Sequence, residues 1–96
     1  MLWRQAKAKV LARRGEHAEA ERLAREAVAI GEDSDFLDGQ GDAFDDLAEV
    51  LVVVGKADEA AEALEQALER FERKGNVVSA GRVRARLIEL GHAARS

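Results

Sequence analysis

Apolar residues recur every three or four positions along most of the chain, and glycines interrupt that pattern at wide intervals. This period is typical of amphipathic α-helices that bury one face. It predicts an all-α fold with five helices joined by short turns. The expected helices are Leu2 to Arg14, His17 to Ile30, Asp35 to Val54, Ala57 to Lys74 and Val77 to Leu90.

Glycines and short polar residues mark the expected helix ends. Gly15, Gly75 and Gly91 should close helices as C-caps, and Gly31 should break the second helix. Ser34 or Asp35 is the expected N-cap of the third helix, and Asn76 that of the fifth. We expect His92 to Ser96 to begin a sixth helix.

The third predicted helix contains two glycines, Gly39 and Gly41, in its first half. Each costs roughly 1 kcal/mol relative to alanine inside a helix. Two interpretations follow: one long helix from Asp35, or a stable helix that begins only at Asp42. The apolar face continues through this segment, and we therefore favour the long helix.

The turn glycines also reveal an internal repeat. Gly15 and Gly55 are 55 − 15 = 40 residues apart, and Gly55 and Gly91 are 91 − 55 = 36 apart. Such periods indicate stacked helix pairs, in which small residues allow two helices to approach closely. The positions that match at the 40-residue offset are Ala8 with Ala48, Leu11 with Leu51, Ala20 with Ala60, and Ala27 with Ala67.

This arrangement of small residues, large residues and turn glycines resembles the tetratricopeptide repeat family. The resemblance implies a right-handed solenoid of about two and a half repeats, with units at 1–34, 35–75 and 76–96. Lys7 and Arg84 depart from the pattern, as does the absence of the family's proline. The residues that carry it are Ala8, Leu11, Gly15, Ala20 and Ala27 in the first unit; Phe44, Leu47, Ala48, Leu51, Gly55, Ala60 and Ala67 in the second; and Ala80, Val83, Leu87 and Gly91 in the third.

The first unit and the 40-residue period also resemble the C-terminal repeat regions of large bacterial ATP-binding signalling and transcription regulators. In such proteins, the nucleotide-binding and DNA-binding domains lie outside the repeats. The resemblance therefore implies a part of a larger regulator that itself holds no cofactor and makes no direct contact with nucleic acid.

Composition narrows the candidate functions further. The 96 residues include no cysteine, which excludes disulfides and thiolate zinc sites, and the net charge is −4, which disfavours a broad phosphate-binding surface. No apolar run approaches the ~20 residues of a membrane span, and we expect a cytoplasmic protein without membrane contact.

The sequence contains no convincing pattern of catalytic or metal-binding residues. His17 and His92 are the only imidazoles, and His17 with Glu21 lacks a third metal ligand. The aspartates from Asp33 to Asp42 do not match the calcium loop of an EF-hand. We therefore expect a non-enzymatic protein with no catalytic, cofactor-binding or metal-binding residues.

In this family the first helix of each unit lines the concave surface, and charge alternates there from basic to acidic to basic. Opposite charges on neighbouring helices could simply attract one another. Alternatively, the acidic centre could receive a basic protein or peptide, with Val52 or Val53 pointing into the groove beside Ile88. The candidate partner-binding residues are Gln5, Lys9, Arg13, Asp42, Asp45, Asp46, Glu49, Val52, Val53 and Arg82.

A structural role is the alternative to partner binding. The end helices of a short array lack a neighbour to cover them. Trp3, Val10 and the face of the fifth helix are therefore candidates for homodimer formation without a separate peptide ligand.

Overall fold

The computed structural model of the chain describes residues 2–92, and these residues confirm the all-α prediction. The side chains of Trp3 and His92 and the residues 93–96 lie outside what is described, and so does the expected sixth helix. The described elements are α1 (Leu2–Arg13), α2 (His17–Glu32), α3 (Leu37–Val53), α4 (Ala57–Lys74), α5 (Val77–Leu87) and a short π-helical turn, η1 (Ile88–His92).

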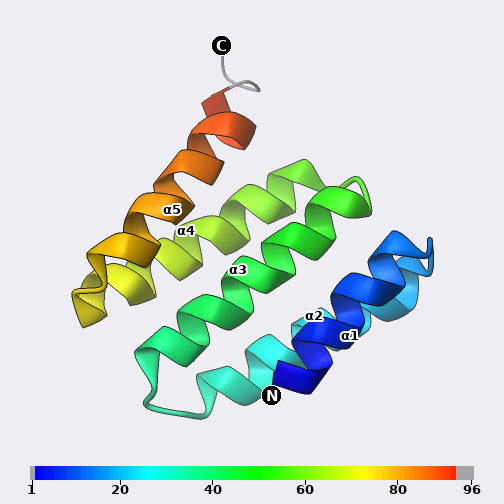
Figure 1. Ribbon diagram of the computed structural model, residues 1–96, viewed down its shortest axis with the longest axis horizontal. Helices are drawn as coiled ribbons and strands as arrows, with labels where there is room; N and C mark the ends of the chain where they lie inside the picture. The colour runs from blue at the N-terminus through cyan, green and yellow to red at the C-terminus, as the bar shows by residue number, and fades with distance from the viewer. Residues whose placement is uncertain (1, 93–96) are drawn as a thin grey trace.

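The helices form two layers (Figure 1). α1, α3 and α5 make up one layer, and α2 and α4 lie behind them in the other. α3 is the central helix, because it packs against α1, α2 and α4, whereas α5 packs against α4. We call the outer surface of α1, α3 and α5 the first-helix face and that of α2 and α4 the second-helix face.

Three turn glycines end α1, α3 and α4 in the same manner. Gly15, Gly55 and Gly75 have φ between 84° and 87°, a left-handed conformation that strains any residue with a side chain. The N–H after each glycine donates to a carbonyl in the preceding helix turn, as in the 3.0 Å bond from Glu16 to Leu11. These terminal hydrogen bonds satisfy free carbonyls at the helix end, and the left-handed glycine reverses the chain.

Two other glycines do not end a helix, and the expectation that Gly31 and Gly91 do so is wrong. Gly31 lies inside the last turns of α2, and Gly91 lies within η1, which continues directly from α5. Neither residue adopts the left-handed conformation of the turn glycines. Gly31 is instead buried within the helix.

The observed helix starts agree only in part with those predicted from the sequence. Asn76 caps α5 as predicted, since its Oδ1 accepts a 3.1 Å bond from the N–H of Ser79. α3 starts at Leu37, with Phe36 rather than Ser34 or Asp35 at the N-cap. Ser34 instead accepts a 3.0 Å bond from the N–H of Phe36, which holds the preceding turn.

Small residues occupy the closest helix contacts. Large side chains without exposed surface, such as those of Leu64 and Phe71, pack around these small residues. Such dense packing leaves little room for added volume. The alanines with 0% exposure are Ala8, Ala20, Ala27, Ala48, Ala60 and Ala67.

α3 is one continuous helix through Gly39 and Gly41, so the long-helix interpretation is correct. Gly41 is buried, and a Cβ atom there would lie 2.7 Å from the Cε1 and Cζ atoms of Phe71. Because the Phe71 ring is fully buried, it has no room to move aside. The glycine weakens the helix locally, but it allows α3 and α4 to approach.

Among residues 2–92, no helix is both long enough and apolar enough to cross a membrane.

We predict that Gly41→Ala destabilises the protein. Overpacking against Phe71 should cost about 1–3 kcal/mol, and the better helix propensity of alanine should offset only about 1 kcal/mol of that. The expected net loss in the free energy of unfolding is up to about 2 kcal/mol, measured by urea denaturation followed by circular dichroism.

Gly81→Ala is the matched control, because Gly81 also lies inside a helix, α5, but a Cβ there meets no atom within 4 Å. This variant should gain up to about 1 kcal/mol from helix propensity. If Gly41→Ala proves as stable as Gly81→Ala, the close approach of Gly41 and Phe71 is not a packing constraint.

Candidate functional site

The first-helix face brings the candidate partner-binding residues together. Gln5, Lys9 and Arg13 come from α1, and the acidic residues and valines come from α3, which lies beside it (Figure 1). Arg82 comes from α5 on the other side of α3 and contacts Asp45. The residues therefore share one surface, whose centre is α3.

Most charges between α1 and α3 are paired with each other. Lys9 Nζ lies 2.7 Å from Asp46 and 3.5 Å from Glu49, and Arg13 lies 3.7 Å from Glu49. Gln5, which is only 3% exposed, donates a 2.5 Å bond to Asp46. This is the intramolecular attraction that the alternating charges suggested.

The charge of Lys9 is held in place by these partners. Desolvation by itself would lower the pKa of Lys9, but the hydrogen bond and charge of Asp46, with those of Glu49, outweigh it and raise the pKa. The ammonium group is therefore more stable in the folded protein than in water. Lys9 thus acts as a fixed positive charge between α1 and α3.

Asp45 makes the corresponding link from α3 to α5. It is 7% exposed, its Oδ2 accepts a 2.9 Å bond from Arg82, and its Oδ1 pairs with Arg86. Two guanidinium groups from successive turns of α5 therefore enclose one carboxylate. The sequence analysis missed Arg86, although its i, i+4 spacing from Arg82 places both arginines on the same side of the helix.

Asp42 differs from its neighbours, because no ion pair of Asp42 is present within residues 2–92. Partial desolvation and then repulsion by Asp46, with smaller contributions from Asp45 and Asp38, raise its pKa, and Arg82 opposes this only in part. Among the predicted acidic residues, Asp42 is thus the carboxylate that a partner's cation could reach most readily.

An apolar hollow of about 220 Å³ opens on the same face, between the end of α3 and η1. Val52 and Val53 are 42% and 44% exposed, so both point outward, as was expected of at least one of them. Leu90, rather than the expected Ile88, lines the hollow with them. The charged residues at its rim are Glu49, Arg86 and Glu89.

In the described part of the chain, no three histidine, cysteine, aspartate or glutamate side chains gather into a metal-binding group. His17 lies exposed at the start of α2. The first-helix face presents an apolar hollow, paired charges and, within residues 2–92, the unpaired carboxylates of Asp42 and Glu89.

We predict that Asp45→Asn destabilises the protein by about 1–3 kcal/mol, the range for losing hydrogen bonds to a charged group. The variant keeps the size of the side chain but leaves Arg82 and Arg86 without their carboxylate. The free energy of unfolding at neutral pH, measured by urea denaturation, tests this.

Asp42→Asn is the control, one turn away on the same helix. Because the folded state raises the pKa of Asp42, its ionisation costs stability as pH rises through that pKa. The asparagine variant should therefore be equal to or slightly more stable than the parent at neutral pH, and any gain should vanish in acid. Equal losses for both variants would contradict the special role of Asp45.

Comparison with known proteins identifies the architecture. A family model described as tetratricopeptide repeat matches residues 1–73, which include both complete helix pairs. No curated protein and no solved structure matched the chain. Tetratricopeptide repeats generally mediate protein–protein interactions and are typically non-enzymatic scaffolds. Because the match covers well over half of the sequence, the chain belongs to the tetratricopeptide repeat family.

Proposed function

We propose that this protein is a non-enzymatic interaction module that binds a segment of a protein partner on its first-helix face. The observation that carries the proposal is the hollow beside Val52 and Val53, where apolar side chains remain exposed. Of the charged residues at its rim, Glu49 and Arg86 are already paired, whereas Glu89 has no ion pair within residues 2–92. Apolar surface of this kind, rimmed by charged residues, is typical of contact sites. An apolar side chain of the partner would fill the hollow.

The paired carboxylates are poorer anchors than the hollow. A partner cation that approached Asp45 or Asp46 would have to displace Arg82, Arg86 or Lys9 from contacts that also join the helices. Removing one member of a largely buried pair costs more than an exposed pair contributes. The partner's affinity should therefore come first from the apolar anchor.

Asp42 supports a basic residue as the second feature of the partner. It lies ten residues before Val52 on α3, a distance of about 15 Å at the helical rise of 1.5 Å per residue. An extended peptide covers that distance in about five residues. We thus propose a partner segment with an apolar side chain and, about five extended residues away, a lysine or arginine.

The proposed function also includes the kind of protein to which the chain belongs and the compartment in which it acts. The resemblance to the repeat regions of large bacterial regulators supports a place in a larger cytoplasmic regulator. In that setting the chain would supply protein contacts, whereas catalysis would belong to other domains.

We predict that Val52→Asp/Val53→Asp weakens peptide binding at least tenfold. The probe is a set of peptides selected from a random display library on the immobilised parent protein, and affinities are measured by fluorescence anisotropy. An unpaired carboxylate in the hollow must be desolvated when a partner's apolar side chain enters. Selected peptides that bind parent and variant equally would remove the hollow from consideration.

A second candidate function is self-association through α5. Val77 and Val78 are 78% and 79% exposed, and Ile88 at the start of η1 is 58% exposed. These residues form apolar surface that no helix covers within residues 2–92. A second copy of the chain could bury it, which supports the homodimer suggested by the sequence.

We predict that, if the parent protein is dimeric, Val77→Asp/Val78→Asp makes it monomeric, as measured by light scattering with size-exclusion chromatography. Each variant is the control of the other. The α5 variant should keep peptide binding, and the hollow variant should keep the parent's mass. A strictly monomeric parent at high concentration would exclude the homodimer and leave the peptide-binding proposal intact.

A further inference from the structure

The second-helix face contains a furrow between α2 and α4. Both helices pack on α3, whose side chains form the floor of the furrow. This furrow lies on the side of α3 opposite to the first-helix face and shares none of the residues proposed above to bind a partner.

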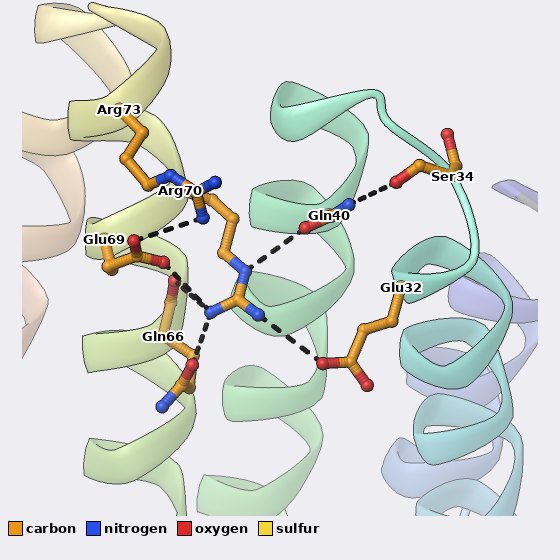
Figure 2. Close-up of polar contacts among 7 residues, drawn as sticks. All are labelled: Glu32, Ser34, Gln40, Gln66, Glu69, Arg70 and Arg73. Carbon is orange, nitrogen blue, oxygen red and sulfur yellow. Dashed lines mark hydrogen bonds and ion pairs between the residues drawn. The ribbon is translucent and has the colours of Figure 1, made fainter.

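One end of the furrow is filled by an arginine of the chain itself, as Figure 2 shows. Arg70 extends from α4 across α3, and only 14% of its side chain is exposed. Its guanidinium lies 4.7 Å from the centre of the Phe44 ring, which is the geometry of a cation–π contact. Its polar partners come from three helices: Glu32 at 3.4 Å on α2, Gln40 at 3.3 Å on α3, and Gln66 and Glu69 on α4.

The middle of the furrow has the same kind of surface, and the arginine that lines it, Arg25, is paired with Glu21 and Glu59. A hollow of about 430 Å³ opens there, and Phe44 and Gln66, which contact Arg70, also line it. Leu47 and Leu51 extend the apolar floor. At its other end, Arg25 crosses from α2 to Glu59 on α4 with a 2.6 Å bond. The hollow is thus bounded at both ends by arginine contacts.

Two carboxylates beside this hollow remain available. Glu62 and Glu65 line it from α4, both are exposed, and neither takes part in an ion pair within residues 2–92. The charges around the hollow are therefore unbalanced, because Arg25 is already shared between Glu21 and Glu59. A cation that entered would find acceptors without displacing any contact.

We propose that this hollow binds an arginine side chain of a protein partner, at a second interaction surface independent of the first-helix face. The guanidinium would lie on the apolar floor as Arg70 does, and would donate hydrogen bonds to Glu62 and Glu65. A planar guanidinium suits this site better than an ammonium, because it stacks on apolar and aromatic surfaces and can donate to two carboxylates at once. Between the two arginine contacts the hollow is open to solvent, so a partner's side chain could enter it from outside.

The test uses an alanine- and glutamine-based helical peptide with a single arginine. Two further peptides carry lysine or neutral citrulline at the same position. Each is titrated into the whole chain while the methyl resonances of Leu47, Leu51 and Ala63 are followed by NMR. We expect saturable shifts at these methyls with the arginine peptide, weaker binding with lysine, and none with citrulline.

Glu62→Gln/Glu65→Gln should weaken binding of the arginine peptide at least tenfold. The control variant Glu16→Gln/Asp35→Asn removes two exposed carboxylates outside the furrow and should bind like the parent. The proposal is overturned if citrulline and arginine peptides bind alike, if both variants lose affinity equally, or if the furrow methyls do not shift. Shifts at Val52 and Val53 report on the first-helix face, and the two proposals can therefore fail separately.

Discussion

The close approach of α3 and α4 is the constraint on which the rest of the structure depends. It requires a residue without a side chain at Gly41, because the Phe71 ring occupies the space that a Cβ would take. Ala48, Ala60 and Ala67 have no exposed surface and keep the same pair of helices close along its length. Without this contact, α3 would lose the position from which it supports α1 and α2.

Both proposed binding surfaces depend on the position of α3. Residues in a helix are rotated by about 100° from one to the next, so neighbouring positions face different directions. Phe44, Leu47 and Leu51 form the floor of the furrow, whereas Val52 and Val53 line the hollow on the opposite side. One well-fixed helix can therefore serve two partners, provided that its packing does not change.

The sequence predicted the features that local chemistry determines. Left-handed turns favour glycine, and Gly15, Gly55 and Gly75 were predicted from their places at the ends of apolar helical patterns. The Asn76 cap is equally local. Contacts between distant residues could not be predicted in this way: nothing near Gly41 in the sequence indicates Phe71, and nothing near Gly31 indicates that it is buried.

The same limit applies to the charges of the candidate site, because their pairing depends on residues that are distant in the sequence. The run of acidic residues on α3 was visible in the sequence, but whether each carboxylate is free depends on side chains some forty residues away. Asp45 is buried between Arg82 and Arg86, and Asp46 is held by Lys9 and Gln5, so the residues that made the surface look acidic mainly join helices.

The carboxylates that remain available are fewer and lie elsewhere. A partner gains from a carboxylate only if that group does not already have a cation beside it, because an occupied pair must first be broken. By that criterion Asp42 and Glu89 are available acids of the first-helix face, and Glu62 and Glu65 are those of the furrow. The two surfaces therefore select partners by the same principle. In each, an apolar hollow supplies a place for a side chain, and unpaired carboxylates on the same face favour a partner that carries positive charge.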